Sequence, residues 1–142
     1  MRKIYISAIL LFMVCFQSFA QVEVSTRLMR ALQNSNPNDY VKGIVYLRDQ
    51  VDLQTLDARL YAEKALPETR SYEVITALMD KAAATQGPFI QYFEGKKGTR
   101  EVFTYKTFWI ANMIGIEARA SVFNELMNNM AVAELDLDAE TF

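Results

Sequence analysis

The chain of 142 residues carries 15 Lys and Arg against 17 Asp and Glu, and it contains no histidine. A slightly acidic chain without a basic stripe does not fit nucleic-acid binding. The missing histidine excludes a Ser-His-Asp or Cys-His catalytic arrangement and a histidine-ligated zinc or copper site. We therefore expect neither enzymatic activity nor a cofactor.

Residues 1–20 have the features of a secretory signal peptide. Arg2 and Lys3 precede an apolar run at residues 4–16, and a short polar stretch leads to Ala20, a small residue at a predicted cleavage point. The run is shorter than the roughly 18 apolar residues of a membrane-spanning helix. The sequence thus predicts export to the periplasm or beyond, with no stable membrane insertion after cleavage near Ala20.

Cleavage after Ala20 removes Cys15, the only cysteine of the chain. An alternative, attachment of a lipid at Cys15, is disfavoured because Val14 stands where a small residue is required. The exported chain then has no disulfide or thiol chemistry, and its net charge becomes −4 because Arg2 and Lys3 leave with the leader. Its length suits one compact domain without staples.

The first elements after the leader are short. Residues 21–39 form an N-terminal segment with a predicted short helix and a loop of turn-forming residues. Residues 40–48 are rich in Val, Ile and Tyr and predict a strand, in which Gly43 marks a bend or a close approach. Asp52 is a candidate N-cap for a short amphipathic helix that follows.

A long helix is predicted from about Ser71. Val74, Leu78 and Ala82 recur at four-residue intervals, which indicates one face turned to the core. Gly87 and Pro88 are expected to interrupt the helix, because proline lacks a backbone donor and clashes with the preceding turn. Gly95 and Gly98 are expected to end it.

The C-terminal part predicts strands at residues 102–107 and 109–117, a helix capped by Ser121 with Leu126 facing inward, and a half-exposed strand at residues 133–137. The order strand, helix, strand, strand, helix, strand is typical of an α+β fold of the ferredoxin-like, split βαβ type. Its expected form is a four-stranded antiparallel sheet with two helices on one face.

Acidic residues alternate near the C-terminus, at Asp136, Asp138 and Glu140. On a strand this period places the three carboxylates on one side, which is compatible with calcium or a paired-acid site. A solvated strand face is the favoured interpretation, because no glycine turn or second acidic cluster accompanies them.

Three stretches carry a resemblance: "VKGIVYLRDQVDLQTLDAR", then "SYEVITALMDKAAATQ", then "YKTFWIANMIGIEARASVFNELMNNMAVAELDLD". In this order and spacing, residues 40–138 resemble the inhibitor-type propeptide of secreted subtilisin-like serine proteases, in the bacillopeptidase-like branch. The resemblance implies a domain that assists folding of the protease and then remains as a tight competitive inhibitor. The implied partner is a subtilisin-like protease domain.

The "FWIAN" run holds the residues that mark the resemblance: Phe108, Trp109 and Asn112. One interpretation places the two aromatic rings in the core, where Asn112 would need backbone hydrogen-bond partners. The other follows from the resemblance, since the face without helices packs against the protease in that family, and Trp109 would then lie at its rim.

The resemblance also assigns a role to residues 139–142, Ala139, Glu140, Thr141 and Phe142. In the family this segment lies extended in the protease's substrate cleft like a reaction product, and Phe142 would stand beside the catalytic serine. The competing interpretation is a frayed terminus without such a role.

Two alternatives stay open. Family propeptides continue into a protease domain, so this chain is either a stand-alone inhibitor or chaperone, or the N-terminal part of a larger precursor. The runner-up function is a secreted ferredoxin-like module that binds a small ligand or a protein, because fold alone does not determine function.

Overall fold

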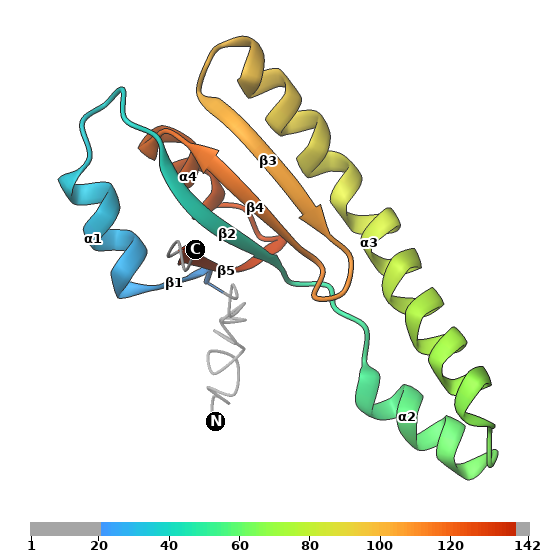
Figure 1. Ribbon diagram of the computed structural model, residues 1–142. Helices are drawn as coiled ribbons and strands as arrows, with labels where there is room; N and C mark the ends of the chain where they lie inside the picture. Colours follow the sequence, from blue (N-terminus) through green and yellow to red (C-terminus); the bar gives the residue numbers. More distant parts are fainter. Residues whose placement is uncertain (1–20, 139–142) are drawn as a thin grey trace, which may run out of the picture.

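The structure is a computed structural model, and it describes residues 21–138 (Figure 1). The signal-peptide prediction for residues 1–20 and the cleft-binding prediction for residues 139–142 therefore lie outside the described residues. The fold is α+β, as predicted. Its elements are β1 (Glu23–Val24), α1 (Thr26–Asn34), β2 (Val41–Leu47), α2 (Leu53–Ala62), α3 (Pro67–Gly98), β3 (Val102–Phe108), β4 (Met113–Ala118), α4 (Ala120–Leu126) and β5 (Val132–Leu137).

The sheet of the described chain has five strands in the order β1-β5-β2-β4-β3. Strands β5, β2, β4 and β3 pair antiparallel, whereas β1 pairs with β5 in parallel, so the sheet is mixed. The predicted sheet of four antiparallel strands was therefore incomplete. Strand β1 has two residues, too few to produce a visible alternation of apolar and polar side chains.

Helices α3 and α4 cover the same face of the sheet. Val45 lies in register with Ile114 and Leu135, and all three side chains are fully buried. On this face the Phe93 ring of α3 lies 5.6 Å from the Tyr105 ring of β3. Helix α4 approaches Gly43, where a Cβ atom would lie 2.6 Å from Phe123 Cε1. The expectation of a close approach at Gly43 is confirmed.

Direct polar contacts tie these two helices together. Tyr92 donates a hydrogen bond to Glu125 (2.7 Å), and Lys96 Nζ lies 2.6 Å from the same carboxylate and 2.8 Å from Glu101. Burial and the hydrogen bond to Glu125 raise the pKa of Tyr92 far above its ordinary value. These groups fix α3 beside α4 over the sheet.

Helix α3 is longer than predicted, since it runs without interruption from Pro67 to Gly98, about 48 Å at 1.5 Å per residue. Pro67 occupies the start of the helix, where the missing N–H costs nothing. The expected break at Pro88 was wrong. Proline disfavours a helical residue before it partly through a clash with that residue's Cβ, which Gly87 lacks, and the helix continues although Pro88 donates no backbone hydrogen bond.

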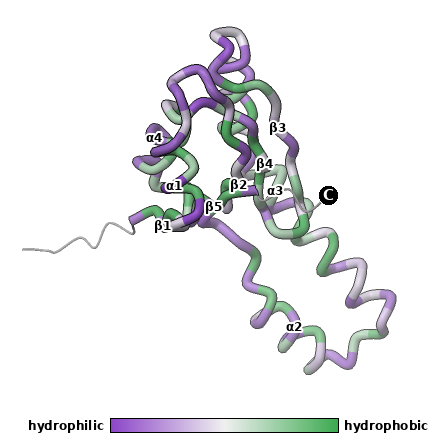
Figure 2. Tube along the Cα trace, turned by 60° about the vertical axis from the view of Figure 1, so that its left-hand side comes forward, coloured by the Kyte–Doolittle hydropathy of each residue, from purple (hydrophilic) through white to green (hydrophobic). Residues whose placement is uncertain are grey.

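The first half of α3 and the whole of α2 extend beyond the end of the sheet (Figures 1 and 2). We call residues 53–81 the hairpin. Arg59 pairs with Glu73, and Arg70 pairs with Asp57, so ion pairs join the two helices. Leu60 is fully buried between them, outside the main core.

This arrangement corrects two predicted core positions. Ala82 is buried, but Val74 and Leu78 are only half-buried in the hairpin, because the sheet ends before it reaches them. Leu126 of α4, in contrast, is buried under the sheet as predicted. Within residues 21–138, none of the helices is both long enough and apolar enough to span a membrane.

Candidate functional site

The face of the sheet opposite α3 and α4 is the candidate functional site, and we call it the open face. The strand registers place on it the residues that alternate with the core positions. These are Lys42, Ile44 and Tyr46 of β2; Thr104, Lys106 and Phe108 of β3; Met113, Gly115 and Glu117 of β4; and Glu134 and Asp136 of β5. Apolar side chains gather toward the β3–β4 turn, whereas charges lie on β5, at Lys106, and at the other end on Lys42 and Glu117.

A shallow groove of about 360 Å³ lies on the open face over Gly115. Gly115 has no side chain to fill this position, and the Phe108 ring approaches to 3.5 Å from where its Cβ would be. Lys42, Lys106, Glu117 and Asp138 stand at the walls of the groove. The groove can therefore take an apolar side chain and offer charges of both signs around it.

The two sides of the open face differ in charge. On the β3 side, the ammonium group of Lys106 lies 5.2 Å from the centre of the Phe108 ring. On the β5 side, Asp136 binds Arg27 of α1 at 2.7 Å. A hydrogen bond from Ser25, helped by the Leu137 amide and Arg27, holds the pKa of Asp136 below its ordinary value.

The acidic alternation does not form a metal site in the described chain. Asp136 is engaged with α1, Asp138 borders the groove, and Glu140 lies outside the described residues. Among residues 21–138, no three carboxylate, cysteine or histidine side chains cluster as metal ligands.

Strand β5 ends beside the open face. The Asp138 amide still donates to the Lys42 carbonyl at 3.1 Å, so pairing with β2 continues to the last described residue. Residues 139–142 follow this point in the sequence. The sequence-predicted tail is thus attached at the edge of the groove, while its own placement is outside the described residues.

The three residues of the "FWIAN" run separate in the structure. Phe108 is the last residue of β3, and its side chain lies on the open face. Residues 109–112 form the turn to β4, where the start of a strand was predicted. Trp109 is 38% exposed in this turn, so the prediction of a buried Trp109 in the core was wrong. Its position is nearer to the alternative, a rim of the sheet.

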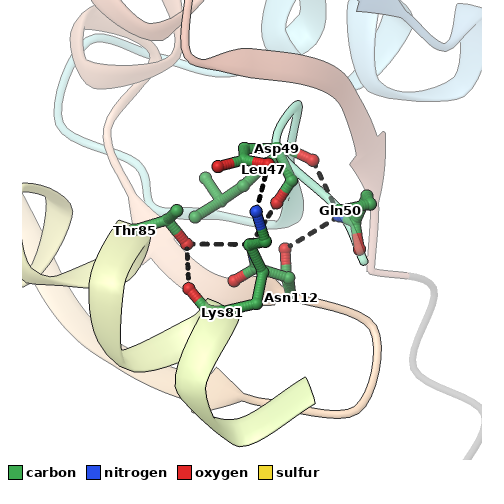
Figure 3. A network of polar contacts seen from close by, with 6 residues as sticks. All are labelled: Leu47, Asp49, Gln50, Lys81, Thr85 and Asn112. Atoms are coloured by element: carbon green, nitrogen blue, oxygen red, sulfur yellow. Dashed lines mark hydrogen bonds and ion pairs between the residues drawn. The ribbon is translucent and has the colours of Figure 1, made fainter. Parts of the chain in front are cut away.

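Asn112 is buried with only 1% exposed, at the centre of a polar network (Figure 3). Its Nδ2 donates to the Asp49 carbonyl (2.8 Å) and to Thr85 Oγ1 (2.9 Å), and its Oδ1 accepts from Gln86 Nε2 (3.0 Å). The side chain thereby has partners on both α3 and the loop after β2. The expectation of backbone partners for a buried Asn112 holds for the Asp49 carbonyl, whereas its other two partners are side chains.

The backbone of Asn112 explains why asparagine suits this position. Its φ of 40° lies in the left-handed region, which asparagine tolerates better than most residues. Its carbonyl accepts from the Leu47 amide at 3.1 Å and from the Gln50 side chain at 3.4 Å. The network locks the β3–β4 turn against the base of the hairpin, so its role is structural.

Sequence reasoning missed the groove at Gly115 and the buried partner Gln86. The signal for the groove was present in "MIGIEA", where glycine takes a polar-face position of a regular alternation. Gln86 carried no local signal, because only the fold brings it to Asn112.

Comparison with known protein families, with curated protein sequences and with solved structures gives no match for this chain.

Proposed function

We propose that this chain acts as a propeptide-like partner of a subtilisin-like serine protease, which it helps to fold and then inhibits like a bound product. The supporting observation is the strand order β5-β2-β4-β3 with α3 and α4 on one face, the arrangement of a ferredoxin-like, split βαβ unit. This unit leaves its other face open, and β5 ends beside that face. Strand β1 and the hairpin are additions to the unit.

In this proposal the open face provides most of the contact area and residues 139–142 enter the substrate cleft. The apolar part of the face, formed by Ile44, Tyr46 and Met113, is bordered by charged residues. Protein interfaces commonly have such an apolar core and polar rim. The segment after β5 would add strand-type hydrogen bonds in the cleft, with Phe142 in the primary specificity pocket.

The proposal includes export after removal of residues 1–20 and requires no catalytic residue or cofactor in this chain. It applies equally to a stand-alone inhibitor and to the N-terminal part of a protease precursor. The N-terminus of the protein recovered from the exporting host, measured by mass spectrometry, tests the export step. A product that begins at Met1 would contradict it.

The inhibition test is a titration of a subtilisin-type protease from the same genome with the intact chain, a chain lacking residues 139–142, and Phe142→Asp. Burial of the Phe142 ring is worth about 1.5–3 kcal/mol, so we expect inhibition to weaken about tenfold to hundredfold. An aspartate there would place an unpaired charge in an apolar pocket. Circular dichroism should show all three chains folded.

Equal inhibition by the intact and trimmed chains would overturn the tail mechanism. Absence of inhibition by every form would overturn the protease proposal itself. The groove over Gly115 would then favour the second candidate, a secreted binding module for a small ligand or a protein, whose binding does not depend on residues 139–142.

A further inference from the structure

Helix α3 carries one seam along most of its length that is apolar except at Gln86. Seven residues follow one another at alternating spacings of three and four, the pattern of a coiled-coil seam. They are Tyr72, Ile75, Met79, Ala82, Gln86, Phe89 and Phe93. Helix positions with this spacing share one side of the helix.

The two halves of the seam have different surroundings. From Ala82 onward the seam is buried against the sheet, with Phe93 fully buried and Gln86 bonded to Asn112. The preceding part is exposed: Tyr72 by 71%, Ile75 by 45% and Met79 by 51%. The helix continues past the sheet in Figures 1 and 2, so its apolar side continues without a cover.

Helix α2 does not cover this side. Its ion pairs reach Arg70 and Glu73, which lie on another side of α3 than the exposed seam. Lys81 is likewise bound to Asp49 at 2.6 Å, away from the seam. The paired charges of α3 therefore lie away from the apolar strip, and their ion pairs do not cover it.

The positions that flank the exposed seam are uncharged. In a paired coiled coil these flanking positions meet the other helix and determine which partner is accepted. Here they are Thr69, Ser71, Thr76, Leu78 and Ala83. A second copy of the same helix can therefore approach without any like charges opposite one another, whereas a charged partner gains nothing.

We propose that the exposed seam is a self-association surface, on which two copies of this chain pair their α3 helices antiparallel about a two-fold axis. Ile75 lies closest to the axis and contacts the partner's Ile75. Tyr72 of each copy packs against the partner's Met79, a sulfur–aromatic contact that is repeated by symmetry. Glu68 stands four residues before Tyr72, where the same spacing would place the next seam residue. In this register Glu68 lies opposite the partner's Ala83.

This pairing is independent of the protease proposal and compatible with it. The hairpin leaves the sheet at the end that holds the β3–β4 turn, whereas β5 ends at Leu137, and Asp138 after it lies beside the start of β2. Both open faces therefore stay accessible in the dimer.

The first experiment uses cysteine cross-linking in the full chain produced in an exporting host, on a Cys15→Ser background. The substituted position then carries the only thiol. Ile75→Cys should form a disulfide-linked dimer under mild oxidation. Tyr61→Cys is the matched control, because Tyr61 is more exposed, at 75%, but lies on α2 away from the seam. Equal cross-linking of the control would overturn the proposal.

A mixture of Tyr72→Cys and Met79→Cys chains tests the antiparallel direction. The mixture should cross-link faster than either chain alone, and stronger linkage in Tyr72→Cys alone would overturn the antiparallel arrangement.

Sedimentation equilibrium tests self-association without a cross-link. The average mass should rise by about half between ~10 μM and ~1 mM, from near the monomer toward the dimer, because the contact is small compared with standard interfaces. Ile75→Asp should hold the chain monomeric throughout, while Tyr61→Asp should behave like the unchanged chain. A wild-type chain that stays monomeric at the highest concentration would overturn the proposal.

Discussion

Two regions of the molecule share the apolar periodicity of α3 but are stabilised differently. One is the sheet with the helices that cover it, and the other is the hairpin. In the sheet region, the apolar side of α3 meets a second layer, and Phe89 and Phe93 join a continuous core. In the hairpin, the same side of the same helix faces solvent at Ile75 and Met79. A periodic pattern thus tells which side of a helix is apolar, but it does not tell what covers that side.

The two regions should also differ in local stability. The hairpin is joined by exposed ion pairs, which are typically worth only about 0–1 kcal/mol each, and by the burial of Leu60. The sheet region has fully buried side chains from α3, α4 and three strands. We therefore expect the hairpin to open before the sheet does.

The largest expected effect comes from one substitution made in both regions. Leu126→Ala removes a side chain buried under the sheet and should lower the free energy of unfolding by about 2–5 kcal/mol. Leu78→Ala, at a half-buried position of the hairpin, should cost clearly less. Urea denaturation followed by circular dichroism measures both.

Equal losses for Leu126→Ala and Leu78→Ala would contradict the expected difference in stability, because they would place the hairpin in the same cooperative core. A loss at Leu78 alone would reverse it.

A smaller effect is expected where the two regions meet, at Asn112. Asn112→Ala leaves the Gln86 amide without its side-chain acceptor. It also removes the two hydrogen bonds that Asn112 Nδ2 donates to Asp49 and Thr85 at the hinge, the place where the hairpin joins the sheet. Each buried unsatisfied group costs about 1–3 kcal/mol, so stability should fall by about that amount. Hydrogen exchange should quicken first in residues 81–86 and in the turn at residues 109–112.

Asn112→Gly is the matched control, because glycine accepts the left-handed φ of 40° but removes the same side chain. The two variants should share the loss of the network, with Asn112→Ala adding backbone strain. Unchanged exchange at the hinge in both would show that the network does not join the regions.

The smallest effect concerns the ion pairs of Lys96 in the sheet region. Hydrogen bonds from Lys96, with smaller contributions from Thr99 and Tyr92, lower the pKa values of Glu101 and Glu125 from an ordinary value of 4.5. Such depressed carboxyls add stability above about pH 4.5, and this stability is lost as the pH falls through their folded pKa values. Lys96→Met should therefore destabilise the chain slightly at neutral pH.

The cost of Lys96→Met should shrink in acid, because the carboxyls that it leaves unpaired are then protonated. Denaturation midpoints of both chains at pH 7 and near pH 3.5 give the comparison. A cost that is the same at both pH values would show that lost packing of the Lys96 stem, and not its charge, is responsible.

Much of the fold could be read from local pattern. The alternation in β2, β4 and β5 and the apolar face of α4 each reflect burial against one core, so they were visible in single segments. The interruption of α3 was wrongly expected because Gly87 and Pro88 were both taken as helix breakers. Gly87 instead lacks the Cβ atom that contributes to the clash with a following proline. The turn at residues 109–112 was missed because its apolar residues, Trp109 and Ile110, are exposed.

The candidate site was less predictable than the fold. The open face follows from strand pairing between distant segments, and no single segment states which of its faces the helices cover. Asn112 could be singled out as a polar residue within an apolar run, but its partners Thr85 and Gln86 come from a helix that only tertiary structure brings near. The role of Phe142 rests on the resemblance, outside the described residues.

The place of β2 in the sheet has a consequence for when the chain can fold. Val45 pairs with Ile114 on one side and with Leu135 on the other, so β2 is made early, gains one neighbour with β4 and gains the other only with β5. Such distant pairings fold slowly, because the closing of long loops precedes any gain from contacts. The sheet can therefore be completed around β2 only once β5 has been synthesised.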